Sequence, residues 1–191
     1  MQKDEVYYFH QTPETLCSEL VKHIPDLTTE DVVFEPFSGE GNFVRAFPDN
    51  QFLITSEIQD GRDYKDIDLE TTLIDWVISN PPFRLEEPDG EDGATKRVNA
   101  FFKLTEYFCG KTNKGVAFLG NSDCLSSLTP PRLKKLYEEK HVYIYKIVVC
   151  SVKKWRGRYY FIIFKNRYTR EEEHHEIKER FDFFDFIEGS F

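Results

Sequence analysis

Short apolar runs alternate with amphipathic segments along this chain of 191 residues. Runs rich in Val, Ile, Leu and Phe predict buried strands at 31–37, 51–57, 73–78, 114–120, 142–149 and 159–164. Apolar spacings of three and four residues predict helices at 13–24, 98–108 and 130–140, and a shorter helix at 42–47. Strands that alternate with helices favour an α/β fold with a mostly parallel sheet.

The last two predicted strands are joined by the connector 150–158, which is too short to hold a crossover helix. These two strands are therefore expected to be antiparallel. The length suits one domain. We expect an N-terminal helix in 1–27, a core in 31–164, a charged and aromatic tail in 165–191, and no separate target-recognition domain.

A proline-rich motif directly follows the apolar run that ends at position 78: Ser79, Asn80, Pro81, Pro82 and Phe83. Two prolines after a strand end the hydrogen-bond ladder and stiffen the loop. Asn80 and the Pro81 carbonyl offer neighbouring acceptors, which suit a planar amino group, and Phe83 offers a face for a flat ring. Because open α/β sheets bind ligands at the carboxyl ends of their strands, this loop is a candidate site. The alternative is a proline-rich turn after a core strand.

Glycines at alternate positions, Gly39 and Gly41, come just after the first predicted strand, which contains Glu35 and Pro36 near its end. Such glycines let the backbone turn sharply and approach a ligand closely. The motif lacks the third glycine of the dinucleotide fingerprint. Glu57 ends the second strand, where a carboxylate can accept hydrogen bonds from both hydroxyls of a ribose or simply be solvated.

The order of these elements resembles that of class I S-adenosylmethionine-dependent methyltransferases, in the group whose catalytic loop reads Asn-Pro-Pro-Phe and which methylates the N6 amino group of adenine in DNA or RNA. The resemblance implies a Rossmann-like fold with a seven-stranded, mostly parallel sheet, usually ordered 3-2-1-4-5-7-6, and a C-terminal antiparallel hairpin. It implies S-adenosyl-L-methionine as cofactor.

The resemblance also implies residue roles. Glu35 is expected near an amino group of the cofactor, Asp63 and Tyr64 at its adenine, and Thr12 and Pro13, which are predicted to open the first helix, at its methionine end. The cofactor site is then expected to comprise Thr12, Pro13, Glu35, Pro36, Phe37, Gly39, Gly41, Glu57, Asp63 and Tyr64. The catalytic residues are expected to be Asn80, Pro81, Pro82 and Phe83.

The connector 150–158 combines four cations with an indole: Lys153, Lys154, Trp155, Arg156 and Arg158. A basic aromatic loop beside a base-sized site suits a phosphate backbone and a flipped or single-stranded base. Members of the family often place an aromatic side chain against the target base here, so Trp155 is the candidate. The alternative is a solvated turn.

The net charge of −9 argues against an enzyme that holds duplex DNA unaided, because such proteins are usually basic over their binding face. A single-stranded or structured RNA substrate, or a partner subunit that supplies target recognition, becomes more attractive. Methylation of a glutamine amide, methylation of guanine N2 in RNA, and a non-catalytic subunit remain open alternatives.

Several other classes are disfavoured by the sequence. The four cysteines form no C-x-x-C pair and predict reduced, buried thiols, and the His174-His175 pair lacks metal-ligand spacing, so no metal is expected. No apolar run reaches the roughly 18 residues of a membrane span, and the N-terminus has no signal core. We expect a cytoplasmic protein, or a nuclear one in a eukaryote. The polar segment 84–97 is expected to be a mobile lid or insert.

Overall fold

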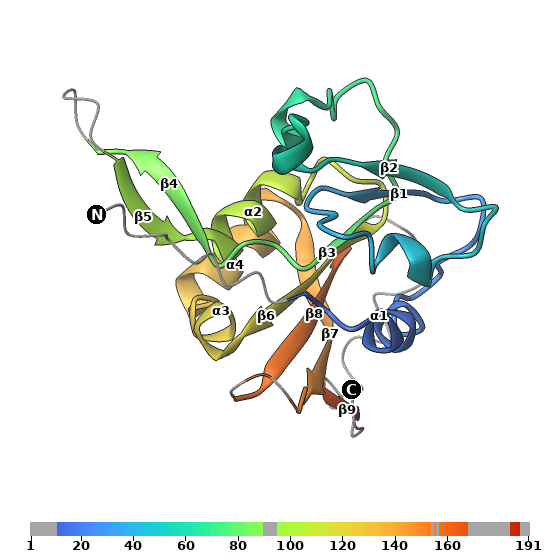
Figure 1. Ribbon diagram of the computed structural model, residues 1–191. Coiled ribbons are helices and arrows are strands. Elements are labelled where there is room, and N and C mark those ends of the chain that lie inside the picture. The colour runs from blue at the N-terminus through green and yellow to red at the C-terminus, as the bar shows by residue number, and fades with distance from the viewer. Residues whose placement is uncertain (1–10, 90–94, 154, 156, 168–183, 188–191) are drawn as a thin grey trace, which may run out of the picture.

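The computed structural model describes residues 11–89, 95–153, 155, 157–167 and 184–187. A central sheet has helices on both faces (Figure 1). In sheet order, its strands are β2 (Phe52–Thr55), β1 (Val32–Glu35), β3 (Trp76–Ser79), β6 (Gly115–Asn121), β8 (Tyr159–Asn166), β7 (Val142–Cys150) and β9 (Phe184–Ile187). The α-helices are α1 (Glu14–Val21), α2 (Ala100–Phe108), α3 (Ser122–Ser126) and α4 (Pro130–Glu139).

The sheet is mixed but mostly parallel. β1 pairs in parallel with β2 and β3, and β3 pairs in parallel with β6. β8 lies between β6 and β7 and is antiparallel to both, which confirms the predicted antiparallel hairpin. The short strand β9, from the expected tail, is added in parallel at the free edge of β7.

The predicted order of seven strands is wrong at one edge of the sheet. Six strands, from β2 to β7, correspond to the order 2-1-4-5-7-6, but no strand precedes β2 in the described part of the chain. The segment after β2 instead forms two 3₁₀ turns, η2 (Ile58–Asp60) and η3 (Tyr64–Asp66). This segment is polar and contains Gly61 in the left-handed region, so it lacks the apolar run that a buried strand requires.

The helix predicted at 42–47 is also wrong, because the structure has only a 3₁₀ turn, η1 (Val44–Ala46). Pro48 follows closely and cannot continue a helix, so too few residues remain for stable α-helical turns. A loop with one 3₁₀ turn, rather than an α-helix, therefore connects β1 to β2.

Two hydrophobic clusters fill the faces of the sheet. Phe101, Leu104 and Phe108 of α2 pack with Leu136 of α4 on one face, and α1 packs on the other face with Phe43 and Phe47. Figure 1 shows α1 on the opposite side of the sheet from α2, α3 and α4. Every residue of β3 is buried, as expected for a central parallel strand that is covered on both faces.

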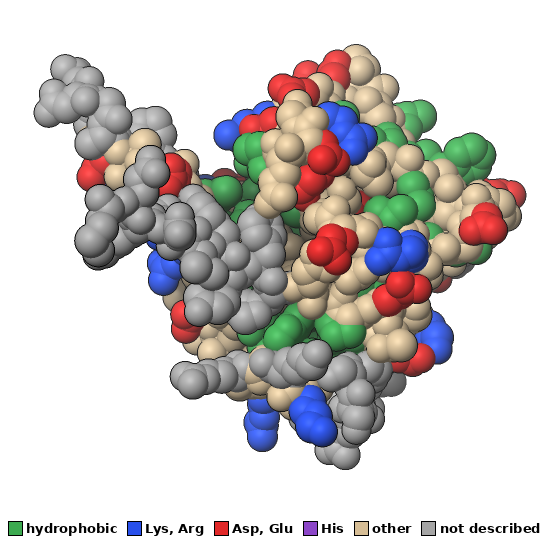
Figure 2. Space-filling view, in the orientation of Figure 1, with side chains coloured by type: hydrophobic (Ala, Val, Ile, Leu, Met, Phe, Trp, Pro, Cys, Tyr) green, Lys and Arg blue, Asp and Glu red, His purple; other side chains and the backbone are tan. Residues whose placement is uncertain are grey.

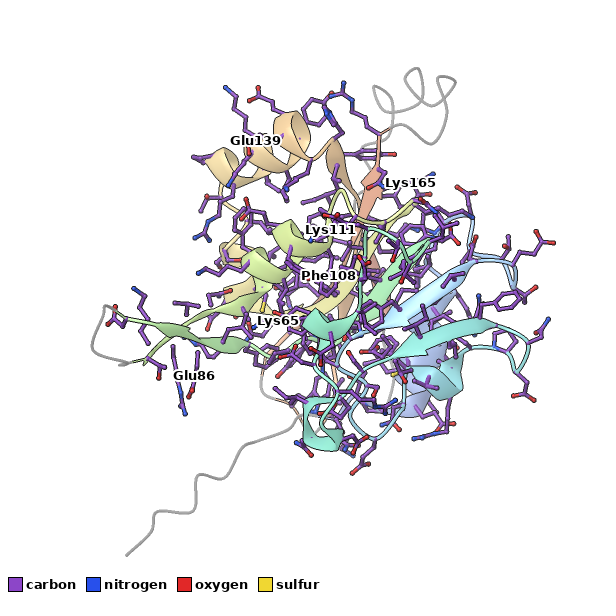
Figure 3. All side chains as sticks on the ribbon, turned by 90° about the horizontal axis from the view of Figure 1, so that it is seen from above. Lys65, Glu86, Phe108, Lys111, Glu139 and Lys165 are labelled. Carbon is purple, nitrogen blue, oxygen red and sulfur yellow. The ribbon has the colours of Figure 1, made fainter. Side chains whose placement is uncertain are left out.

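The segment 84–97, expected as a mobile lid or insert, forms most of a hairpin made by β4 (Arg84–Pro88) and β5 (Thr95–Asn99). The hairpin projects away from the sheet, and in Figure 3 the side chain of Glu86 stands out from it while Phe108 lies inside the body. The helix expected from 98 begins at Ala100, because the Asn99 side chain caps it by accepting from the Phe101 amide at 3.0 Å.

All four cysteines are buried and free, as the sequence predicted. None of the helices in the described residues has the length and apolar character needed to cross a lipid bilayer. The predictions for residues 1–10 and for His174-His175 lie outside the described residues.

Candidate active site

The carboxyl ends of β1, β2 and β3 meet at one edge of the sheet because these neighbouring strands are parallel. Glu35 is the last residue of β1, Glu57 lies just beyond β2, and Asn80 follows β3. Side chains connect these strand ends: the Ser79 hydroxyl donates to Glu35 Oε1, and the Gly39 amide donates to Glu57 Oε2 at 2.7 Å. The motifs singled out in the sequence therefore lie side by side.

The glycine loop after β1 turns through two left-handed residues, Gly39 with φ of 49° and Gly41 with φ of 80°. L-residues with a side chain rarely adopt this backbone conformation, so glycine is favoured at both positions. Apart from Gly39 and its two chain neighbours, no heavy atom of the described residues lies within 4 Å of the position that a Gly39 Cβ would occupy, which leaves space in front of the loop. Glu57 is held at the rim of the loop, because it also accepts from the Gln59 amide at 3.2 Å.

Glu35 is a buried carboxylate, with only 1% of its surface exposed. Oε1 accepts from the Ser79 hydroxyl and from the Phe37 amide at 3.0 Å, whereas Oε2 has no hydrogen-bond partner among the described residues. Burial, with a smaller contribution from the Glu57 charge, raises the pKa of Glu35 to about 8. The carbonyl of Pro36 accepts a 2.9 Å hydrogen bond from the serine hydroxyl just after β2, which fixes the start of the loop.

Phe37 and Tyr64 form an aromatic wall beside the glycine loop. Their rings meet edge to face with centroids 5.1 Å apart, and Tyr64 also packs against Tyr107 at 5.6 Å. Burial raises the pKa of Tyr64 to about 12, so its phenol is neutral. The adjacent Asp63 accepts from the Lys65 amide at 3.0 Å and caps η3, which gives this carboxylate a local structural role.

The Asn80 loop is held on both sides. Asn80 Nδ2 donates to Thr12 Oγ1 at 3.1 Å. Pro81 is buried and Pro82 is exposed. The ring of Phe83 is half-buried against both hydrophobic clusters, and its carbonyl accepts from the first amide of α2 at 3.1 Å.

Thr12 connects the Asn80 loop to the glycine loop. Its hydroxyl accepts from Asn80, and its carbonyl accepts from Asn42 Nδ2 at 2.7 Å. The sequence analysis predicted that Thr12 and Pro13 open the first helix; α1 instead begins at Glu14, with Pro13 at the N-cap position and no side-chain cap among the described residues. Because Thr12 is 95% buried, with 5% of its surface exposed, this bridge is shielded from solvent.

An aromatic row leads from the Asn80 loop to the basic connector. Phe83 lies 6.5 Å from Tyr159 between ring centroids, and Tyr159 lies 4.4 Å from Trp155. Lys153 and Arg158, on either side of Trp155 in the sequence, are exposed. The other predicted cations of this loop lie outside the described residues: Lys154 and Arg156.

Three residues of this edge were missed as contributors to the site by the sequence analysis: Asn42, Ser79 and Tyr159. The sequence analysis named Ser79 only as the first residue of the proline-rich motif. A hydroxyl in a fully buried strand needs a polar partner, so this position could have been recognised. Tyr159 opens β8 directly after the basic connector, so its position in the sequence could have indicated it. Asn42 adjoins Gly41, but nothing in the sequence indicates its contact with Thr12.

Charge is mixed over the described surface. Figure 2 shows acidic and basic side chains interspersed, so the described part of this face carries no continuous basic patch. The net charge of −9 agrees with this picture. Any nucleic-acid contact made by the described residues on this face would therefore depend on a few local cations.

The residues at this edge fit a nucleoside cofactor of the kind the motifs indicated. The open space in front of Gly39 admits a ligand close to the backbone, and Glu57 lies at its rim. In the ionised form of Glu35, the buried Oε2, which has no hydrogen-bond partner among the described residues, is an acceptor that a ligand N–H group could satisfy. Burying such an oxygen without a partner is unfavourable, so a bound donor would relieve that cost.

Comparison with solved structures gives three similar folds. A modification subunit assigned to a type I restriction enzyme of Vibrio vulnificus YJ016 has a TM-score of 0.55 and 13% identity, over 82% of this chain and 44% of its own. A protein of Listeria monocytogenes assigned as a class I S-adenosylmethionine-dependent methyltransferase has a TM-score of 0.52 and 16% identity, over 80% of this chain and 58% of its own. The M protein of the type I restriction enzyme EcoKI has a TM-score of 0.50 and 13% identity, over 85% and 45%.

This chain has the α/β fold of a class I methyltransferase. The chain spans about half the length of these structures, and at such low identity the likeness establishes the fold alone. The sequence matches no family model and no curated protein sequence.

Proposed function

We propose that this protein is an S-adenosylmethionine-dependent methyltransferase that methylates the exocyclic N6 amino group of adenine in DNA or RNA. The observation that carries the proposal is the Thr12 bridge, which holds the Asn80 loop beside the glycine loop through bonds of 3.1 and 2.7 Å. A loop suited to an amino group and a loop suited to a nucleoside cofactor thus share one edge of a methyltransferase fold.

The proposed cofactor contacts are supported by the positions of four kinds of group at this edge of the sheet. Glu57 would accept from the ribose hydroxyls, Gly39 would let the ligand approach the backbone, and Glu35 Oε2 would accept from a cofactor N–H group. Phe37 and Tyr64 would wall the site. When bound, S-adenosylmethionine supplies an electrophilic methyl group on a sulfonium, which leaves as a thioether when the methyl group is transferred.

The Asn80 loop would act on the amino group of the substrate. The nitrogen of an adenine amine is a poor nucleophile because its lone pair is delocalised into the ring. The Asn80 side-chain oxygen and the Pro81 carbonyl would accept its two hydrogens and favour the pyramidal geometry in which the lone pair points out of the ring plane. Orientation and fixed dipoles then lower the barrier, and the released proton goes to solvent after attack.

Aromatic and basic side chains support a nucleic-acid substrate. Phe83, Tyr159 and Trp155 form a row against which an unstacked base could lie, and Lys153 and Arg158 flank it. Two of the compared proteins are a modification subunit and an M protein of type I restriction enzymes. We therefore also propose that a partner subunit supplies target recognition, because this chain has a net charge of −9.

The direct experiment offers one methyl donor and several acceptors. Purified protein is incubated with S-adenosylmethionine carrying a labelled methyl group and, separately, with single-stranded DNA, duplex DNA, total RNA and protein extract. The acceptors are digested to nucleosides or peptides and the labelled product is identified. The expected product is N6-methyladenine in one nucleic acid.

Each other outcome rejects a defined part of the proposal. Label on guanine N2 or on a glutamine amide keeps the amine-directed loop but replaces the substrate. If no acceptor is labelled and no cofactor binding is detected by calorimetry, the protein is a non-catalytic subunit that has kept the fold.

A further inference from the structure

The hydroxyl of Thr12 contacts the nitrogen end of the Asn80 side-chain amide. Thr12 Oγ1 accepts from Nδ2, so the oxygen of this planar amide faces away from Thr12. Rotation of the amide by half a turn would exchange an acceptor for a donor at the substrate side. An amino group brings N–H donors, so only one of the two orientations can bind it.

We infer that Thr12 is a positioning residue that anchors the Asn80 side chain beside the glycine loop, where its oxygen can accept from a substrate N–H group. This inference rests on the proposed function. It assigns Thr12 a role toward Asn80, whereas the family resemblance implied a contact with the methionine end of the cofactor.

The surroundings of Thr12 suit this role. Its backbone is fixed, because its carbonyl accepts from Asn42 Nδ2 at 2.7 Å, and Asn42 in turn accepts from Arg45. Arg45 also pairs with Glu14 at 2.8 Å, which connects the start of α1 to the glycine loop. A buried hydroxyl on a fixed backbone holds its partner in place better than an exposed one, because little water competes for the hydrogen bond.

The test compares Thr12→Val, which keeps the shape and removes the hydroxyl, with Thr12→Ser, which keeps the hydroxyl. Thr112→Val is the matched control, since Thr112 is also buried but its hydroxyl has no hydrogen-bond partner among the described residues. We expect Thr12→Val to lower the single-turnover rate of methyl transfer about 3- to 10-fold, while cofactor affinity by calorimetry changes less than about two-fold. Thr12→Ser and Thr112→Val should retain the wild-type rate.

A second background isolates the contact between Thr12 and Asn80. In Asn80→Ala this contact is already absent, so adding Thr12→Val should cost less than about two-fold in that background. An equal loss in both backgrounds would overturn the inference. A loss of cofactor affinity with an unchanged rate at saturation would also overturn it, because Thr12 would then contact the cofactor.

Side-chain amide NMR provides a readout that does not depend on activity. The Asn80 NH₂ resonances, identified by their absence in Asn80→Asp, should shift or broaden in Thr12→Val and stay in place in Thr12→Ser and Thr112→Val. Unchanged resonances in Thr12→Val would contradict the orienting contact. If the wild-type protein methylates no acceptor, the proposed function fails, and the NMR comparison alone decides whether Thr12 orients Asn80.

Discussion

The hydroxyl of Ser79 donates a hydrogen bond to the buried carboxylate of Glu35, and this bond joins the carboxyl ends of β3 and β1. Ser79 directly precedes Asn80, and Glu35 directly precedes the glycine loop. The two loops are therefore connected twice, here through the sheet and again through Thr12. The charge state of Glu35 is consequently expected to affect both stability and ligand binding.

Glu35→Gln should change how stability depends on pH. Burial raises the pKa of Glu35 from about 4.5 to about 8 in the folded protein, so between these values the unfolded chain loses the proton first. This group therefore contributes stability below pH 4.5 that is lost as pH rises toward 8. Glutamine cannot ionise, so the melting temperature of Glu35→Gln, relative to wild type, should rise between pH 5 and pH 8, by the equivalent of a few kcal/mol. A difference that stays constant with pH would contradict this.

Glu57→Ala should weaken cofactor binding. The proposed ribose contacts are hydrogen bonds to a charged group, so their loss should raise the dissociation constant of S-adenosylmethionine about 10- to 100-fold in calorimetry. Glu138→Ala on α4, where the side chain is exposed, is the control and should bind as the wild type does. Unchanged affinity in Glu57→Ala would place the ribose elsewhere.

Gly39→Ala should separate backbone strain from the loss of ligand space. Gly39 and Gly110 both have positive φ, and among the described residues neither has a neighbour that a Cβ would clash with, so alanine at either position should destabilise the protein by about 1 kcal/mol. A methyl group at position 39 also enters the space in front of the glycine loop. Cofactor affinity should therefore fall at least about ten-fold in Gly39→Ala and keep its wild-type value in the control, Gly110→Ala. Equal affinities in the two variants would show that the cofactor does not approach Gly39.

Trp155→Ala should weaken binding of the nucleic acid more than of the cofactor. Stacking of a base on an aromatic ring contributes about 1–3 kcal/mol, so KM for the nucleic acid should rise about 10- to 100-fold at an unchanged cofactor affinity. Tyr137→Ala, which removes an exposed aromatic of α4, is the control. If Trp155 only packs against Tyr159, the melting temperature falls while KM keeps its wild-type value.

The parts of the fold that the sequence predicted are those with strong apolar signals. β6 is buried along almost its whole length and therefore appears as an uninterrupted apolar run. The hairpin of β4 and β5 could not be predicted in this way, because most of its residues are polar or charged. Glu86 lies opposite Arg97 with 3.8 Å between charged atoms, and such residues resemble a solvated loop in the sequence.

The candidate site was predictable as a set of strand ends but not as a set of contacts. Glu35, Glu57 and Asn80 each follow an apolar run, and parallel pairing brings such positions to one edge. The contact between Thr12 and Asn80 spans 68 positions of the sequence and involves two polar side chains. No periodicity records a contact of that kind, so only the folded chain reveals it.

The most direct test of the account is methyl transfer by Asn80→Ala. Single-turnover rates with labelled S-adenosylmethionine and the accepted nucleic acid are compared with the dissociation constant of the cofactor, and Asn113→Ala, an exposed asparagine near the amino end of β6, is the control. The account predicts a loss of at least about 100-fold in rate, since a fixed dipole at the reacting group is removed, with cofactor affinity within about two-fold of wild type. A wild-type rate in Asn80→Ala would contradict the proposal that this loop holds the amino group.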